Sequence, residues 1–498
     1  MMEGRAMLRW AAMRVAPSLM FALASACTLV GCALIHHDTA PVAEISAAQI
    51  TLADDIHLAH EGWPSARWWT RYQDPQLDAL IEQALTSSPT IAIARSRVSE
   101  ARAQVELIRA GTDLQVSGRA AVDRARVSGN GFLSAYSTNN PGLGATGPWY
   151  TTGLVGVDGR LSIDIWGKDR AQVEAAIGEQ NANRASEAAA ELEISTDVVR
   201  LYYAIQTTYA SLDLLRQARE IAAFVKETHA ARYARGLEGE ALEQQAEASV
   251  LLVDRRLAST EQQITQSREA LRALVGADAH TLPAIDPRPL PSPAASLPAS
   301  LSYELLARRP DLQALRWYVQ SSFDTIDAAK ASFYPSFDIA AFIGFDALHL
   351  SDLFLHTSHE INLIPGLYLP IFDSGKLNAN LHRARSVSDA LIDQYNQAVL
   401  NAVRDVAQAA SRLQDIEQET TLQTGKIATV VFLQDSADAR YARGIADKTT
   451  AQEAREPVIT EQLSLVELNG QAIDQEVALV RALGGGYCSD APADPAPR

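Results

Sequence analysis

Cysteine is scarce in this 498-residue sequence, which contains only Cys27, Cys32 and Cys488. The first two lie in or beside a predicted targeting segment, so no intrachain disulfide framework is available and packing must stabilise the chain. Catalytic signatures are also missing: there is no Gly-x-Ser-x-Gly, no phosphate-binding glycine-rich loop and no His-Glu-x-x-His. We therefore predict that the protein is not an enzyme and has no catalytic residues.

The ten histidines lack the spacing of metal ligands. His349, His356 and His359 are close together, but a metal site there would need a fourth ligand and a rigid element to hold it. We interpret these three as polar residues of a surface loop, and we expect no metal and no cofactor apart from a covalent lipid.

Long apolar runs are absent after residue 31. No stretch of about 18 apolar residues occurs, which excludes a transmembrane helix and leaves a β-barrel as the only structure that could cross a bilayer. Acidic residues outnumber basic ones by 60 to 43, and loss of residues 1–31 removes two net positive charges and changes the net charge from −17 to −19. An acidic chain is a poor ligand for nucleic acid.

The N-terminus predicts export. Three arginines precede a largely apolar stretch, Val15 to Val30, which is followed by Gly31 and Cys32. This pattern is typical of a lipoprotein signal peptide, 1–31, cleaved before the cysteine. A diacylated Cys32 would then anchor the chain in a membrane. The alternatives are lipidation of Cys27 and an ordinary signal peptide that is cut elsewhere.

The sequence repeats itself at an offset of 208 residues. The five residues Arg232–Gly236 recur letter for letter as Arg440–Gly444. At the same offset, Gly167-Lys168 matches Gly375-Lys376, and the glycine of Leu274-Val275-Gly276 matches that of Ala482-Leu483-Gly484. Three landmarks in one register indicate a duplicated unit.

Each repeat predicts a helix, two strands and a very long helical pair. Helical spacing runs from Leu77 to about Ala110, and residues 168–282 contain no proline and are rich in helix-favouring residues. Strands are expected at about 114–127, 150–165, 337–345 and 361–371. The expected division is an extended segment 32–66, a first repeat 67–276 with long helices 168–275, a Pro-rich linker 277–300, a second repeat 301–484 with long helices 376–483, and a flexible tail 485–498.

Four strands cannot close a barrel alone, so the barrel must be shared between chains. Three copies would give twelve strands and two would give eight, and spacing does not choose between them. Long helices attached to a barrel suggest an export duct. The competing interpretation is a periplasmic coiled-coil lipoprotein, but such a protein has no use for paired strands in both repeats. A diffusion porin is disfavoured because porins need no long helices.

The chain resembles the TolC-type outer-membrane factors, specifically the NodT-like lipoproteins of resistance-nodulation-division (RND) efflux systems. The residues that carry this resemblance, besides both Arg-Tyr-Ala-Arg-Gly copies, are Trp68-Trp69, Asp74–Leu77, Asp164–Gly167, Arg308–Leu312, Phe333–Pro335, Pro370–Gly375 and Ala482–Gly486. The resemblance implies a mainly helical fold, in which a homotrimer shares a twelve-stranded β-barrel in the outer membrane and continues as a periplasmic α-helical barrel. It also implies two protein partners, a periplasmic adaptor (membrane fusion protein) and an inner-membrane RND-type transporter.

The resemblance further implies a periplasmic gate where the long helices turn back, near the Arg-Tyr-x-x-Gly segments. The candidate gate residues are Tyr233, Glu238, Glu240, Glu243, Tyr441, Asp447 and Glu453, of which Tyr441 and Glu453 are favoured by motif alignment. Repeated around a trimer, such carboxylates would form an acidic constriction that prefers cations. The alternative is a solvated helix face. Pro457 falls in the last long helix, so that helix either bends near the gate or starts there.

Overall fold

The computed structural model describes residues 42–44, 63–128, 130, 148–278, 280–292 and 308–487. They divide into two compact units, each of which contains segments of both sequence repeats. Unit 1 comprises Met1–Ala43, Ser99–Asn181 and Trp317–Asp393, and unit 2 comprises Glu44–Val98, Ala182–Arg316 and Gln394–Arg498. The three cysteines and the predicted signal peptide lie outside the described residues.

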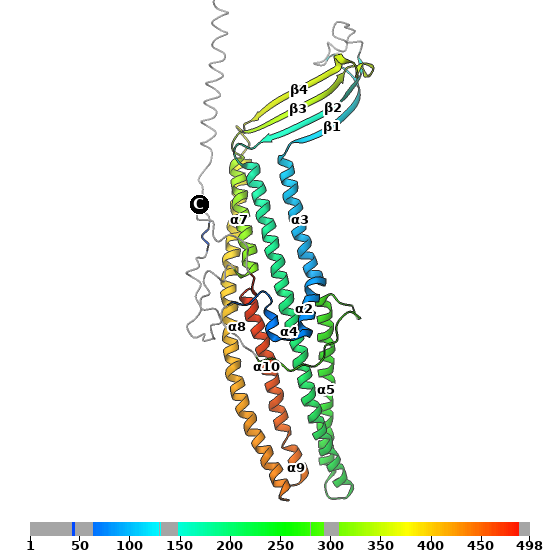
Figure 1. Cartoon of the computed structure of the whole chain (residues 1–498), viewed down its shortest axis with the longest axis vertical. Coiled ribbons are helices and arrows are strands. Elements are labelled where there is room, and N and C mark those ends of the chain that lie inside the picture. Colours follow the sequence, from blue (N-terminus) through cyan, green and yellow to red (C-terminus); the bar gives the residue numbers. More distant parts are fainter. Residues whose placement is uncertain are drawn as a thin grey trace, which may run out of the picture. The chain divides into compact units, whose positions relative to one another are not determined.

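Unit 1 contains one antiparallel sheet with the strand order β1-β2-β3-β4 (Figure 1). The strands are β1 Gln115–Arg126, β2 Trp149–Ile163, β3 Ser336–Ala347 and β4 His359–Tyr368. All four lie close to their expected positions, although β4 ends before Pro370, which has no N–H to donate to a ladder. The first repeat supplies β1 and β2 and the second supplies β3 and β4, so the two repeats are joined by the β2–β3 pairing.

The strand register separates the side chains of the sheet into an apolar face and a polar face. Val116, Val157 and Ile343 belong to the apolar face, because successive strand residues alternate and directly paired residues share a face. The remaining large members of the apolar face are Val122, Trp149, Val155, Leu161, Ile163, Phe337, Ile339, Phe345, Ile361, Leu363 and Leu367. The polar face carries Arg119, Asp123, Asp158, Arg160, Asp338, Asp346, Glu360 and Asn362. Most of these large apolar residues are exposed, although Leu350 and Leu353 of the β3–β4 connection lie against Gly153 at one end of the face.

The two longest helices are identical in length and begin and end at equivalent positions of the two repeats. Helix α4 spans Lys168–Ala234 and α8 spans Lys376–Ala442, each with 67 residues. Helix α4 is followed by α5, Glu240–Val275. In the second repeat two helices replace α5, a short α9, Lys448–Glu453, and then α10, Glu456–Ala482. Pro457 is the second residue of α10, where a missing N–H costs no helical bond, so the last long helix starts near this proline.

The first expected helix is interrupted. It consists of α2, Pro75–Ser87, and α3, Pro89–Thr112, so the prediction of uninterrupted helical spacing from Leu77 to Ala110 was wrong at Ser88. Ser88 has an extended ψ of 127° because Pro89 disfavours the helical conformation in the residue before it. In the second repeat the corresponding helix, α7, Pro310–Ala331, also begins with a proline.

Glycines end the long helices in the same way in both repeats. Gly236 and Gly444 both have φ +71°, and each donates its N–H to the carbonyl three residues earlier. The residue after each glycine donates to the carbonyl five residues back, which completes a Schellman motif. Gly276 and Gly484 end the second helical segment with the same pair of bonds. The repeated landmarks in the sequence are therefore repeated helix ends.

The core of unit 2 joins the N-terminal segment to the long helices. Trp68 and Trp69 lie in a 3-10 helix, Trp68–Tyr72, and are buried together with residues of α2, α4, α5 and α10. Tyr202 is fully buried and donates a 2.5 Å hydrogen bond to Asp74, which also accepts from the Gln76 N–H at the start of α2. Within the described residues, no helix combines the length and the apolar character that crossing a membrane requires.

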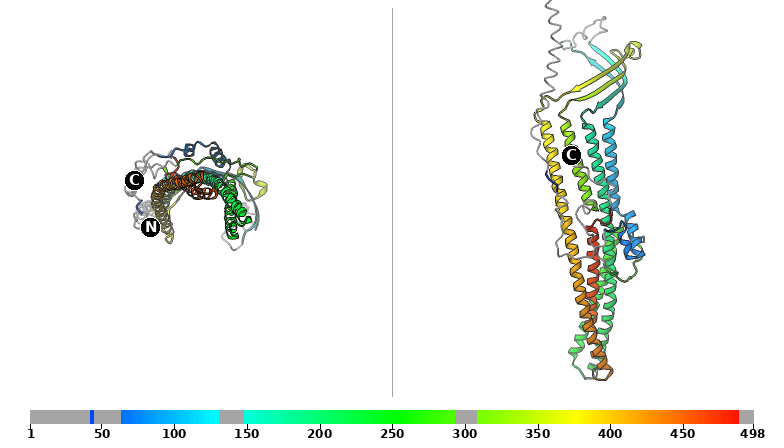
Figure 2. Two further views of the ribbon diagram at one scale, coloured as in Figure 1. Left: turned by 90° about the horizontal axis from the view of Figure 1, so that it is seen from below. Right: turned by 60° about the vertical axis from the view of Figure 1, so that its left-hand side comes forward.

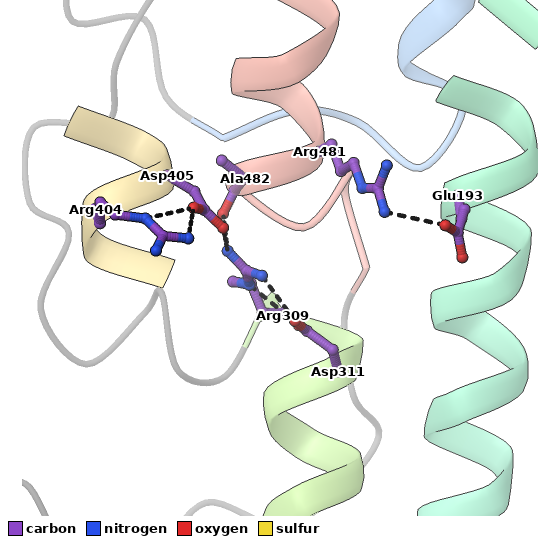
Figure 3. A network of polar contacts seen from close by, with 7 residues as sticks. All are labelled: Glu193, Arg309, Asp311, Arg404, Asp405, Arg481 and Ala482. Atoms are coloured by element: carbon purple, nitrogen blue, oxygen red, sulfur yellow. Dashed lines mark hydrogen bonds and ion pairs between the residues drawn. The ribbon is translucent and has the colours of Figure 1, made fainter. Parts of the chain in front are cut away.

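Arg309 joins the start of α7 to the end of α10 within unit 2 (Figure 3). Its guanidinium donates to both carboxylate oxygens of Asp311, at 3.0 and 2.7 Å, and to the Ala482 carbonyl at 3.3 Å. Although burial raises the pKa of Asp311, the hydrogen bonds and charge of Arg309 outweigh this effect and lower it. Arg309, which Asp311 holds in place through two hydrogen bonds, thus donates to one of the carbonyl groups that the last turn of α10 leaves unpaired.

Gly484 lies too close to this junction for any side chain. A Cβ atom there would be 2.0 Å from the Arg308 carbonyl oxygen, and the residue has φ +87°. In the first repeat, a Cβ atom at Gly276 would be 2.5 Å from the Ser87 carbonyl oxygen. In both repeats the glycine that ends the helical pair therefore packs against the backbone just before the helix-starting proline.

We expect Gly484→Ala to destabilise the protein. The left-handed backbone alone costs an L-residue about 1–2 kcal/mol, and displacement of the Arg308 carbonyl adds to that. Gly425→Ala is the control, because Gly425 lies inside α8 with nothing within 4 Å of an added Cβ, and alanine favours a helix interior by about 0.5–1 kcal/mol. Thermal unfolding followed by circular dichroism should show a lower midpoint for Gly484→Ala only. Equal midpoints for the two variants would contradict the close packing.

Candidate gate at the helix turns

The two turns that connect the long helices lie at the same end of unit 2 (Figures 1 and 2). The first turn joins α4 to α5 and the second joins α8 to α9. Both follow directly from the repeated Arg-Tyr-Ala-Arg-Gly sequence, since its glycine ends each long helix in a left-handed conformation. The turns are therefore placed by the same local chemistry, and their differences lie in the side chains.

A network of four charged or titratable side chains joins the two turns, and we call it the turn network. Arg232, at the end of α4, donates to Glu238 at 2.9 Å and to Asp447 at 2.7 Å. Glu238 also bonds His229 Nδ1 at 2.6 Å. The side chains of His229 and Glu238 are only 14% and 18% exposed, so this part of the network is shielded from water. One arginine thus ties its own turn to the turn of the other repeat.

Asp447 has a second role at the start of α9. Its carboxylate accepts hydrogen bonds from the N–H of Thr450 at 2.8 Å and from the hydroxyl of Thr450 at 2.7 Å, which makes it the N-cap of that helix. The Thr450 hydroxyl, followed by Arg232, lowers the pKa of the Asp447 carboxyl far below its usual range. The same residue therefore starts α9 and binds Arg232.

The ion pair between Arg232 and Asp447 persists at neutral and mildly acidic pH. The pKa of Asp447 is lowered in the folded protein, so its contribution is complete above the ordinary aspartate pKa of about 4 and is lost only as the pH falls through the lowered value. The pKa of Glu238 is lowered as well, first by its hydrogen bond from His229 and then by Arg232. Both carboxylates are thus charged throughout the physiological range.

The structure brings together only two of the seven candidate gate residues, Glu238 and Asp447. Tyr233 and Tyr441 are 42% and 44% exposed at their helix ends. Glu240 and Glu243 lie in the first turn of α5, and Glu453 is the last residue of α9. None of these five belongs to the turn network in the described part of the chain, and their role at the gate stays a prediction.

Sequence reasoning missed His229 and Arg232 as members of the network. Arg232 belongs to the repeated Arg-Tyr-Ala-Arg-Gly motif, but the motif alone does not predict that this arginine binds the carboxylates. A signal was present in the repeat alignment, because the second repeat has Ala446 where the first has Glu238, and the first has Gly239 where the second has Asp447. The acidic partners of Arg232 thus lie at two of the positions at which the two turns differ.

A cation–π contact and an ion pair hold α9 beside these turns. The Lys448 ammonium lies 4.7 Å from the centroid of the Phe224 ring on α4. Arg455, between α9 and α10, lies 3.4 Å from the carboxylate of Asp438 on α8. No group of three His, Cys, Asp or Glu side chains with the arrangement of a metal site occurs among the residues that the structure describes.

Long helices that turn back in two equivalent places, together with a sheet that has one apolar face, define a protein of the outer-membrane channel class. The chain belongs to the outer membrane efflux protein family, whose model matches residues 80–277 and 301–485. The predicted family and fold class are thereby confirmed.

The chain is similar to named relatives over nearly its whole length. It is 49% identical over 465 residues to the multidrug resistance outer membrane protein MdtP of Shigella flexneri, covering 93% of this chain and 95% of that protein. Identity to MdtQ of Escherichia coli O157:H7 is 38%, covering 92% and 96%. Among solved structures, the outer membrane protein VceC of Vibrio cholerae matches with a TM-score of 0.75 and 30% identity, covering 85% of this chain and 100% of VceC.

We expect Arg232→Ala to increase leakage through the protein. The substitution removes the bond to Asp447 that joins the two turns and the bond to Glu238 within the first turn, and it leaves the shielded carboxylate of Glu238 with only His229. Single-channel recording at pH 7 should show a higher open probability or conductance. The control is Arg235→Ala, which removes the same charge from the same motif but no bond of the turn network. If both variants behaved alike, the turn network would not hold the turns together.

Proposed function

We propose that this protein is the outer-membrane duct of a multi-part efflux pump and conducts small molecules from the periplasmic side to the exterior. The observation that carries the proposal is the division of the sheet into an apolar and a polar face. Strands that alternate in this way fit a wall with lipid on one side and water on the other. Membership in the outer membrane efflux protein family supports the same conclusion.

The duct that we propose is a homotrimer. The outer edges of β1 and β4 have no neighbouring strand within the described chain, and unpaired backbone groups are costly in a bilayer. Three chains that pair β1 of one copy with β4 of the next would supply twelve strands and leave no free edge. A periplasmic adaptor and an inner-membrane RND-type transporter would then deliver the exported molecules and the energy.

The N-terminus would add a lipid anchor through diacylated Cys32. Its support is the sequence of the first 32 residues, in which an apolar stretch with basic residues before it leads to Gly31-Cys32. Incorporation of labelled palmitate should disappear in Cys32→Ser and persist in Cys27→Ser. Labelling that persisted in Cys32→Ser would move the lipid to another residue.

The turn network would keep the periplasmic end closed at rest. Opening requires the turns to separate, and each chain must then break the bond of Arg232 to Asp447. The remaining candidates, Glu240, Glu243 and Glu453, would line the constriction and favour cations. This passive gate would open when the adaptor and transporter bind.

A matched pair of substitutions in β1 tests the membrane assignment of the two faces. Ala120 lies on the apolar face and Ala121 on the polar face, and both are exposed. Arginine facing lipid near the middle of the bilayer costs about 2–4 kcal/mol, whereas arginine facing water costs little. Ala120→Arg should therefore reduce the yield of heat-resistant trimers in outer membranes, and Ala121→Arg should not.

The function itself is tested on the purified wild-type protein. Light scattering should give the mass of three chains after correction for detergent, and planar bilayers should show discrete conductance steps. A monomer without conductance, combined with equal behaviour of Ala120→Arg and Ala121→Arg, would refute the duct and favour a coiled-coil scaffold.

A further inference from the structure

The apolar face of the sheet carries charge at only one place. Among the strand residues of this face, Arg124 and Arg126 are the only ones that are charged at every physiological pH, and no Asp, Glu or Lys occurs. Both arginines lie at the end of β1 that leads into the hairpin connection, and both are exposed. The charged residues of the polar face, in contrast, are spread along all four strands.

An exposed tryptophan lies beside the two arginines. Trp149 is directly paired with Arg126 at the last position of the β1–β2 ladder, so the two side chains share the apolar face. The Arg124 guanidinium lies 5.7 Å from the centroid of the Trp149 ring, within range of a cation–π interaction. Trp149 nevertheless remains 55% exposed. We call Arg124, Arg126 and Trp149 the basic rim.

The connection between β3 and β4 lies over the same face near the same end. A Cβ atom at Gly153, on the apolar face of β2, would be 2.9 Å from Leu350 and 3.1 Å from Leu353. Phe354 packs against Phe345 with ring centroids 6.0 Å apart but is itself 75% exposed. The hairpin end of the apolar face therefore combines exposed apolar side chains with the basic rim.

Few carboxylates are available to neutralise the basic rim. The segment between β1 and β2, residues 127–148, contains no Asp, Glu, Lys or Arg. The segment 348–358 contains a single carboxylate, Asp352, which accepts a hydrogen bond from the Ser351 hydroxyl. The neighbouring Asp123 and Asp346 are on the polar face. No carboxylate of the four strands therefore lies on the same face of the sheet as the two guanidinium groups.

These contacts indicate which molecule the basic rim would bind. On a lipid-facing surface, a tryptophan is favoured at the level of the headgroups, and an arginine is tolerated where it can reach that level. A guanidinium binds a phosphate group through two parallel hydrogen bonds. In the proposed duct the hairpin end faces the exterior, because the opposite strand ends lead into the helices. The nearby lipids are then the phosphorylated glycolipids of the outer leaflet.

We propose that Arg124, Arg126 and Trp149 form a binding site for the phosphate group of an outer-leaflet glycolipid. This inference rests on the proposed function, since it takes the apolar face to contact lipid. The arginines bind the phosphate oxygens, Trp149 lies against the sugar and the upper acyl chains, and the apolar side chains near Leu350 contact the acyl chains below. The site would fix the depth of each chain in the membrane.

The experiment titrates the detergent-purified trimer with lipid A and counts bound lipids by native mass spectrometry. The double variant Arg124→Gln/Arg126→Gln should bind lipid A about tenfold to a hundredfold more weakly than the wild type, because charge-assisted hydrogen bonds are lost. The control is Arg119→Gln/Arg160→Gln, which makes the same change on the polar face of β1 and β2 and should bind like the wild type. Arg124→Lys/Arg126→Lys should retain part of the affinity.

Other outcomes would overturn the site, the glycolipid assignment or the proposed function. Equal loss in the rim and control variants would show attraction to overall charge and overturn the site. Equal affinity for phosphatidylglycerol would overturn the assignment to a glycolipid. If the wild type forms conducting trimers but does not bind lipid A, the site fails while the duct stands. If no conducting trimer forms, the proposed function fails first, and trimer mass identifies variants that do not assemble.

Discussion

The unsatisfied edges of a four-stranded sheet are the constraint on which the rest of this architecture depends. The backbone groups on the outer sides of β1 and β4 have no partner strand in the described chain, and neither water nor a second layer is available to them in a bilayer. A single chain therefore cannot be stable there. In the proposed homotrimer the copies pair edge to edge, and this pairing also determines which side chains face lipid and which line the interior. The turns, the helices and the basic rim acquire their proposed roles only through that closure.

The features that could be predicted from the sequence are those set by local chemistry. Glycines at 236 and 444 end their helices because only glycine adopts a left-handed conformation without cost, and this is visible as a repeated letter. The strands could be placed within a few residues because alternation is a local pattern. The break at Ser88 was missed because the apolar spacing continues through it, although Pro89 had marked the position. The bond between Arg232 and Asp447 could not be predicted, since it joins residues 215 positions apart.

The two repeats have kept their backbone and diverged in their side chains. The same turn geometry occurs twice, but Glu238 and Asp447 each replace a small residue of the other copy. Divergence at these two positions allows one arginine to contact both turns, which two identical turns would not provide. In α9 and α10, Pro457 has divided a helix that the first repeat keeps intact as α5. The two repeats thus share one backbone arrangement, and a few substitutions made the side chains of the two turns complementary.

The equal length of α4 and α8 has a consequence for how such proteins can vary. Each helix has 67 residues, or roughly 100 Å at 1.5 Å per residue, and their turns meet through a single arginine. An insertion of one helical turn into α4 alone would move the connection between α4 and α5 by about 5.4 Å along the helix axis and would rotate it only slightly. Arg232 would then no longer reach Asp447. Changes in length must therefore occur together in both repeats, in α4 with α8 and in their returning partners. The length of the duct therefore depends on α4 and α8 together, and neither repeat can change it alone.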